Sequence, residues 1–488
     1  AVIFLFINIS STAPNLHLAA STARDRARRR DAPTRRMSPA RSRRPASAFE
    51  VANARKGRLD SPLAVLPFFV SYLLPVVFLL STRASAGDFP GTRALSNSWT
   101  CAWFVFAVLP ILEVVVPDDL ANPTDEESRR AAKDWRYKMP LVLWIIPQCV
   151  AIVAGARAFC DVDASFHRRL GLVLSAGVCT GGVGITVAHE LLHKTTKLEL
   201  FLAKVLLTSV CYAHFCVEHR FGHHKRVGTP DDPASAKRYT SFYAFFVKSV
   251  VGTYRGAWRI WLGEDENAVH LGQVAKKTFG ETFMTDAHVL PALWAVGLFF
   301  ANKRDIKAVC FFLLQALVAV TLLELVNYVE HYGLTRVSLE DHITSDDRVS
   351  TAYEPVTPAH SWNAPQRVTN WFVFRLQRHS DHHARAATPY QALRTYAEAP
   401  TLPTGYTGTM LVALAPWWFE KCLGPVLDAR QNFLDEDEKN NGDESSKRNK
   451  RKRVADADAL ARRRARQGVL FATALVTAAA WAPVAYLQ

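Results

Sequence analysis

The chain has 488 residues, of which 49% are hydrophobic and 21% charged, and its formal net charge is +15 at pH 7. This composition excludes a collagen, a coiled coil and a small disulfide-stabilised scaffold. The charge is unevenly distributed: residues 1–58 carry a net +10 and residues 435–467 a net +3, which leaves +2 for residues 59–434. The basic charge therefore gives no reason to expect that the main part of the chain binds nucleic acid.

By composition the chain divides into four segments. Residues 1–58 are rich in arginine and poor in acids, which is typical of a disordered basic extension or an organelle transit peptide. Residues 59–425 are predicted to form a membrane domain. Residues 426–467 are predicted to be a charged, disordered linker. The apolar residues 468–488 are predicted to form either an extra membrane anchor or an amphipathic helix on the membrane surface.

Six apolar stretches in the membrane domain approach the length of about 20 residues that crosses a bilayer. They lie near residues 62–80, 99–117, 139–159, 170–188, 287–301 and 308–328. Residues 200–217 are also apolar but include Lys204 and His214, so this stretch is predicted to lie in the membrane plane or to insert partly. The predicted fold class is all-α, a polytopic integral membrane protein with about six transmembrane helices.

Lysine and arginine near the ends of these stretches predict their orientation, because such residues are more frequent on the cytoplasmic side. Loops 81–98, 160–169 and 302–307 hold two, two and three of them, whereas residues 118–138 alone hold five. Both ends of the six-span core are therefore predicted to face the cytoplasm. Residues 189–286 and everything after residue 329 fall on the same side.

The eight cysteines include no C-x-x-C pair, and several lie within apolar runs. They are interpreted as buried small residues, without a disulfide framework. A fused iron–sulfur electron carrier of the rubredoxin type is not expected, since it needs such pairs to hold its iron.

Half of the sixteen histidines fall in three short segments, HELLH at 189–193, HRFGHH at 219–224 and HSDHH at 379–383, and His331 lies at the end of the last strong span. On a helix, residues i and i+4 share a face. Three pairs are therefore each expected to direct two imidazoles at one spot: His189 with His193, His219 with His223, and His379 with His383. Neutral imidazole is a common ligand of zinc, copper, iron and nickel. Nine histidines are too many for one ion, which indicates two.

Other interpretations of the same residues remain open at this point. Taken alone, His189 to His193 match the H-E-x-x-H pattern of a zinc protease with Glu190 as base, but that function leaves at least six clustered histidines without a role. A membrane metal-binding protein without catalytic activity is another possibility. A nucleic-acid binder would rest on the basic run Lys447–Arg453 and on the N-terminal arginines.

The amino-acid sequences of the histidine segments, and of several other stretches, resemble those of a known family. The stretches are HELLHK at 189–194, EHRFGHH at 218–224, NYVEHYGL at 327–334, LQRHSDHH at 376–383, TPDDPAS at 229–235, HSWN at 360–363 and LPTGY at 402–406. They resemble the alkane 1-monooxygenases, which are integral-membrane non-haem di-iron enzymes of the membrane fatty-acid desaturase and hydroxylase superfamily. The resemblance runs from about residue 60 to 425 and excludes both basic tails.

The resemblance implies that nine histidines on the cytoplasmic side ligate two irons. They are His189, His193, His219, His223, His224, His331, His379, His382 and His383. It implies no bridging carboxylate, so four acidic neighbours are interpreted as hydrogen-bond partners of the ligand rings. These are Glu190, Glu218, Glu330 and Asp381. Glu113 and Glu324, which lie within apolar runs, are expected either to line the active cavity or to pair between helices.

The resemblance also implies the reaction and its partners. The expected reaction is hydroxylation of the terminal carbon of n-alkanes, or of similar alkyl chains, with O2 as co-substrate. Electrons would come from rubredoxin and its reductase, with Arg220, Lys225, Arg226 and Arg378 as candidate docking charges. The substrate would enter from the bilayer along a slot lined by Trp103 to Leu109. A fatty-acid desaturase or hydroxylase acting on acyl chains is the alternative.

Overall fold

The computed structural model describes residues 59, 61–83, 97–264, 270–339, 342–343, 349–350, 353–396, 399–439 and 444–485. All of these residues belong to one unit, residues 50–488. The predicted basic extension, residues 1–58, lies outside the described residues. Apart from one antiparallel pair of two-residue strands, β1 (His342–Ile343) and β2 (Val349–Ser350), the regular structure of the described part is helical.

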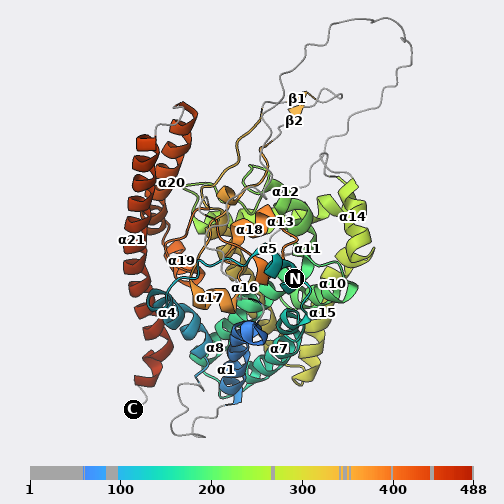
Figure 1. Ribbon diagram of the computed structural model, residues 1–488. Coiled ribbons are helices and arrows are strands. Elements are labelled where there is room, and N and C mark those ends of the chain that lie inside the picture. Colours follow the sequence, from blue (N-terminus) through green and yellow to red (C-terminus); the bar gives the residue numbers. More distant parts are fainter. Residues whose placement is uncertain are drawn as a thin grey trace, which may run out of the picture. The chain divides into compact units, whose positions relative to one another are not determined.

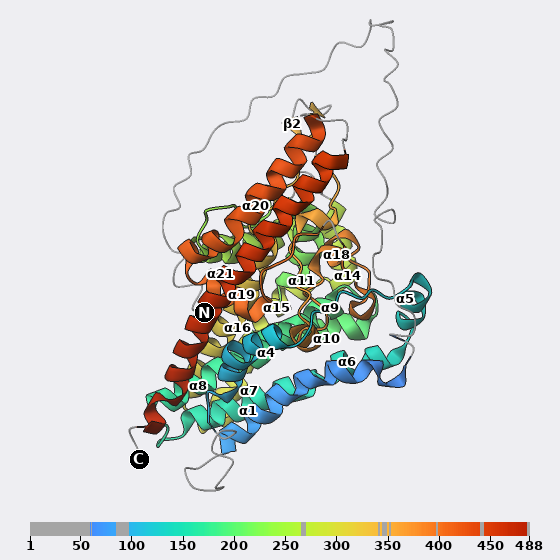
Figure 2. The same ribbon diagram turned by 60° about the vertical axis from the view of Figure 1, so that its left-hand side comes forward.

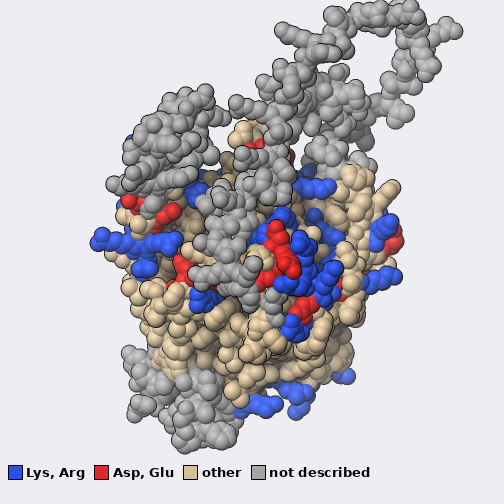
Figure 3. Space-filling model, in the orientation of Figure 1, with Lys and Arg blue, Asp and Glu red and all other residues tan. Residues whose placement is uncertain are grey.

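Five helical segments are long and apolar enough to cross a membrane, namely Pro62–Arg83, Trp135–Cys160, Phe166–Leu192, Phe283–Ala301 and Ile306–His331. A sixth, Thr100–Val115, is apolar but shorter. Together they coincide with the six predicted stretches. Several expose large apolar side chains, among them Ile146, Leu293 and Leu317, as lipid contact requires. On the face drawn in Figure 3, a broad surface without charged side chains lies below a zone rich in charged ones. The predicted all-α integral membrane fold is confirmed.

Along the first half of the chain, several spans consist of consecutive helical pieces of different pitch. The pieces are η3 (Pro62–Tyr72) and α1 (Leu73–Arg83); α3 (Thr100–Trp103), η4 (Phe104–Val108) and α4 (Leu109–Val115); α5 (Asp125–Ala131); η5 (Trp135–Tyr137), α6 (Met139–Val142) and α7 (Ile145–Cys160); and α8 (Phe166–Gly177), η6 (Val178–Ile185) and α9 (Thr186–Leu192). Two of these pieces, η4 and η6, are π-helical, and so is η7 (His219–His223) further along the chain. Such turns occur frequently at functional sites.

The remaining helices complete the bundle. They are α10 (Lys197–Thr208), α11 (Phe215–Glu218), α12 (His224–Arg226), α13 (Phe242–Leu262), α14 (His270–Phe279), α15 (Phe283–Ala301), α16 (Ile306–His331), η8 (Pro358–His360), α17 (Arg367–Phe372), α18 (His379–Ala384), η9 (Tyr390–Ala392), α19 (Tyr406–Ala413), α20 (Pro416–Lys439) and α21 (Glu444–Ala485). In Figures 1 and 2, α11 and α18 lie at one end of the spanning helices and α1 at the other.

Helix α16 is central to the bundle, because it packs against α7, α8, η6, α13, α15 and α19. Its close approach to η6 depends on Gly181, where an added Cβ would lie 2.5 Å from Cα of Ala319. Buried amides also link the helices. The Gln315 side chain donates to the carbonyl of Ser209 and accepts from the Thr180 hydroxyl, at 3.0 and 2.8 Å. In an apolar environment these bonds stabilise one particular arrangement of the helices, since an unpaired amide there is costly.

Two segments differ from the sequence prediction. The stretch 200–217 is not one helix, because α10 ends at Thr208 and the chain turns through Cys211, whose φ is 58°. The segment 426–467, expected to be a disordered linker, is helical in its described residues and belongs to α20 and α21. Its charged residues obscured the small buried ones, Ala461 and Ala465, which share one face of α21.

The close packing of η6 on α16 predicts a difference between two neighbouring glycines. Gly181→Ala places a methyl group against the α16 backbone and should lower the free energy of unfolding by about 1–3 kcal/mol. Gly182→Ala is the control, because an added Cβ there meets nothing within 4 Å. It should leave the stability unchanged or raise it by up to about 1 kcal/mol. Thermal unfolding of both variants in detergent tests this, and equal unfolding temperatures would contradict the packing argument.

Candidate metal centre

The structure brings all nine predicted histidines together at one site, divided into two groups. The five-histidine group consists of His189, His193, His219, His224 and His382. The four-histidine group consists of His223, His331, His379 and His383. Within each group, one ring nitrogen from every member lies within 4.8 Å of the others. The site therefore offers places for two ions, as the number of histidines indicated.

The ring nitrogens face one another at the spacing of ligands on a shared ion. Nε2 of His224 lies 3.0 Å from Nε2 of His219 and 3.1 Å from Nε2 of His382. In the other group, the Nε2 atoms of His223 and His383 are 3.2 Å apart. Two nitrogens each about 2.1 Å from one metal ion stand about 3.0–3.4 Å apart in octahedral or tetrahedral geometry.

Hydrogen bonding between the rings does not explain this arrangement. A neutral imidazole carries one N–H, and Nε2 of His224 meets two other Nε2 atoms. The Nε2 atoms of His189 and His193 are buried without a hydrogen-bond partner. Buried polar atoms are normally paired, so these nitrogens fit a metal ion as their missing partner.

One of the three expected histidine pairs is divided between the groups. His189 with His193, and His379 with His383, remain together, but His219 belongs to the five-histidine group and His223 to the four-histidine group. The reason is that η7 is π-helical, with hydrogen bonds from residue i to i+5. This wider turn aligns His219 with His224 instead.

Two carboxylates contact rings of the clustered histidines. The Nδ1 atom of His223 donates to Oδ2 of Asp232 at 2.9 Å, and Asp232 is fully buried. Oε2 of Glu330 lies 3.1 Å from Nε2 of His379. The sequence interpretation included Glu330 but missed Asp232, which lies in the quoted stretch TPDDPAS. No helical spacing relates Asp232 to His223; a buried acid in a turn was the only available signal.

The other predicted acidic partners bind different groups. Glu190 accepts from Lys194 and from the backbone N–H of Tyr390. Glu218 pairs with Arg226 at 3.0 Å. Asp381 accepts from both Arg385 and the Tyr396 hydroxyl. These carboxylates neutralise or position the surrounding chain and do not hydrogen-bond the nine rings.

Burial lowers the pKa of most of the clustered histidines that lie outside the spans. For His193, His219, His224, His379, His382 and His383 the pKa is well below its usual value, because the site is dry and the other rings repel added positive charge. At His223 burial acts in the same direction, but the charge and hydrogen bond of Asp232 outweigh it and raise the pKa. Neutral imidazole is the form that binds metals.

Most of the predicted docking charges are engaged inside the protein. Arg378 is buried and donates to the carbonyls of Asp119 and Leu393. Arg220 donates to the Leu192 carbonyl at 2.7 Å, and Arg226 pairs with Glu218. Lys225 is the exposed member of the set. The three arginines therefore stabilise the site's framework.

A narrow apolar cavity of about 70 Å³ lies between η4, η6, α16, α17 and α19. Val105, Phe106 and Leu109 line it, as expected for this part of the second span. The lining residue Tyr406 connects the cavity to the histidines, because its hydroxyl donates to Oε1 of Glu330. Through that carboxylate the cavity adjoins His379 of the four-histidine group.

Neither Glu113 nor Glu324 lines the cavity: Glu113 pairs between helices, and Glu324 pairs with the turn before α11 and with its own helix. Glu113 accepts from the hydroxyl of Thr369 on α17. Glu324 accepts from the Tyr212 hydroxyl at 2.9 Å and from Asn327 at 3.3 Å.

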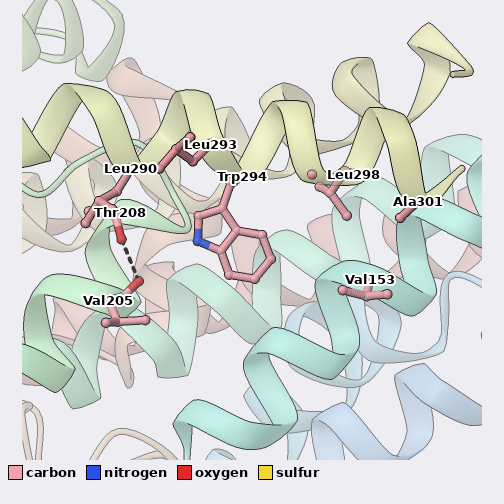
Figure 4. Close-up of a pocket in the computed structure, with 9 residues that line it drawn as sticks. Val153, Val205, Thr208, Leu290, Leu293, Trp294, Leu298 and Ala301 are labelled. Carbon is pink, nitrogen blue, oxygen red and sulfur yellow. Dashed lines mark hydrogen bonds between the residues drawn. The ribbon is translucent and has the colours of Figure 1, made fainter.

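A larger apolar hollow of about 340 Å³ lies between α7, α10 and α15, where Trp294 faces Thr208 and Val205 (Figure 4). Neither this hollow nor the smaller cavity is lined by a histidine of the two groups. Only the smaller cavity has a lining residue, Tyr406, that bonds a carboxylate in contact with one of those histidines, so the smaller cavity is the better candidate for the place of reaction.

The contact between Asp232 and His223 predicts an effect on metal affinity. Asp232→Ala removes the acceptor that orients the ring, and such losses typically weaken metal binding about 10–100-fold. Titration of the metal-free protein with Fe(II) measures this. Asp231→Ala is the matched control, since Asp231 is exposed and adjacent. Equal affinities of the two variants would show that Asp232 does not support the site.

Comparison with known proteins agrees with this geometry. The fatty acid desaturase family model matches residues 165–412, which include all nine histidines. Alkane 1-monooxygenase 2 of Pseudomonas aeruginosa is 37% identical over 68% of this chain and 84% of its own length, and alkane 1-monooxygenase 1 of the same organism is 38% identical over 67% and 81%. XylM, the xylene/toluene monooxygenase hydroxylase component of Pseudomonas putida, is 24% identical over 66% and 80%. The chain therefore belongs to the fatty acid desaturase family and, within it, to the alkane 1-monooxygenases.

Proposed function

We propose that the protein hydroxylates the terminal carbon of n-alkanes, or of similar alkyl chains, to a primary alcohol, and that its nine clustered histidines hold two irons. The observation that carries this proposal is the two adjoining histidine groups, one of which is connected through Glu330 and Tyr406 to an apolar cavity among membrane helices. O2 is the co-substrate. The balanced reaction consumes one alkane, one O2, two electrons and two protons, and yields one alcohol and one water.

The two irons, when bound, supply the O2 activation that an unactivated C–H bond requires and that no side chain provides. The chain itself excludes water and orients the reactants. Val105, Phe106 and Leu109 surround the alkyl chain with apolar surface. Tyr406 and Glu330 define the end of the cavity nearest His379. Asp232 holds the His223 ring in one orientation.

The electrons come from a separate protein. The chain has no C-x-x-C pair, so an iron–sulfur centre of its own is not expected. The resemblance to alkane 1-monooxygenases supports rubredoxin and its reductase as the donor system. Both ends of the six-span core face the cytoplasm in this proposal, supported by the distribution of lysine and arginine. A soluble cytoplasmic donor would then reach the side on which the histidine segments lie.

Two alternatives to alkane hydroxylation remain to be weighed. The first is hydroxylation or desaturation of fatty acyl chains, which the match to the fatty acid desaturase family model supports. A zinc protease would use Glu190 as a free base, but Glu190 is held by Lys194 and the Tyr390 backbone.

Purified protein supplied with O2, rubredoxin, its reductase and NADH should convert alkanes of graded length to 1-alkanols and should contain two irons per chain. Alkanoic acids of the same lengths are offered in parallel, so that a hydroxylated or unsaturated acid identifies the acyl alternative. Absence of turnover with every substrate would contradict the monooxygenase function, and zinc in place of iron would favour the protease.

Removing one ligand from each group tests the assignment of the site. His223→Ala and His382→Ala should each lower the iron content and abolish alcohol formation. His288→Ala is the control, because His288 bonds Tyr254 and belongs to neither group. Full iron content and activity in both ligand variants would contradict the proposed site.

The bond between Tyr406 and Glu330 predicts a separate effect. Tyr406→Phe keeps the ring in the cavity wall but leaves the buried Glu330 without its donor, which disturbs the carboxylate beside His379. We expect kcat to fall about tenfold or more while KM changes little, because the apolar lining is retained. Steady-state kinetics and iron analysis of the variant measure this. A change in KM alone would assign Tyr406 to substrate binding only.

A further inference from the structure

Helix α21 lies outside the part of the chain that matches the family model, yet it packs against the proposed substrate-binding region. It contacts α20, α19, η4 and α3. In Figures 1 and 2 it runs alongside α20 and continues beyond it past α19. Two of these contacted elements, η4 and α19, line the apolar cavity.

The face of α21 that meets the bundle is shaped for close contact. Gly468 allows the approach of α20, because an added Cβ would lie 2.5 Å from Nε1 of Trp418. Val469 is buried against α19, where its Cγ2 lies 3.1 Å from the position of a Cβ at Gly408. Leu475, two turns further along the helix, is 56% exposed. In a membrane such an exposed apolar side chain contacts lipid, and the close-packed side chains contact protein.

Specific hydrogen bonds hold both ends of the apolar half of α21. Near its start, the Trp418 indole donates to the Arg464 carbonyl at 3.2 Å. Near its end, the Trp103 indole donates to the Thr477 hydroxyl at 3.1 Å, and the Asn97 amide donates to the Ala480 carbonyl at 3.2 Å. Trp103 directly precedes η4. These bonds fix one register of α21 relative to the cavity wall.

We propose that α21 is a specificity-determining membrane helix that sets the width of the substrate cavity by holding η4 and α19 at a fixed separation. The cavity lies between η4, with Val105 and Phe106, and α19, with Tyr406 and Met410. A fluid lipid chain in place of α21 would support neither wall rigidly, whereas a packed helix resists displacement. A narrow cavity admits linear alkyl chains and excludes branched or ring-bearing ones. This inference rests on the proposed hydroxylation.

The test compares a linear and a ring-bearing substrate in the full-length enzyme. Gly468→Leu adds a side chain that must push α21 away from Trp418. Thr477→Val removes the hydroxyl that accepts the hydrogen bond from the Trp103 indole, with little change in side-chain shape. In both variants, kcat/KM for butylcyclohexane relative to n-octane should rise. A rise of about tenfold corresponds to the discrimination that one methylene group gives in an apolar pocket. Leu475→Ala, at a largely exposed position of α21, should leave the ratio unchanged.

The possible results separate a specificity role from a structural one. Retained iron content with an altered substrate ratio supports the proposal, and Thr477→Val provides this measurement if Gly468→Leu does not fold. An unchanged ratio, or an equal loss of activity toward both substrates, would overturn it. If the unmodified enzyme hydroxylates neither substrate, the proposed function itself fails, which is a different outcome.

Discussion

Nine imidazole rings with their nitrogens directed at one another form an arrangement that is unfavourable without a shared cation. Lone pairs that face lone pairs repel, and burial removes the water that would otherwise separate them. Much of the surrounding structure serves to keep these rings in place. Helices α9, α16 and α18, together with η7, bring histidines together from distant parts of the chain, and buried groups such as Asp232 and Arg378 fix the connecting segments.

The site depends on a boundary between two environments. On one side, the spans bury apolar residues and the few polar ones are paired, as Gln315 and Glu324 are. On the other side, charged residues bind backbone carbonyls and one another around the histidine segments. Tyr406 belongs to both environments, because its ring lines the apolar cavity and its hydroxyl bonds Glu330. An alkyl chain and a charged metal centre can meet only at such a boundary.

Local features of the sequence predicted much of the fold and the site. Apolar length revealed the spans, and the spacing of His189 with His193 revealed a chelating face. The division of His219 from His223 was not predictable, because nothing in HRFGHH distinguishes a π-helical turn from an α-helical one. Asp232 reaches His223 only through the turn that follows α12. In α21, strong charge concealed a close-packed face that Ala461, Gly468 and Val469 form once the helix meets α20 and α19.

The two histidine groups are built from shared segments. The stretch from His219 to His224 supplies two ligands to one group and one to the other, and α18 supplies His382 to the first and His379 and His383 to the second. A shift of either short segment that changes the ring spacing in one group therefore also moves the rings that the segment supplies to the other group. The geometries of the two groups are thus coupled through the backbone.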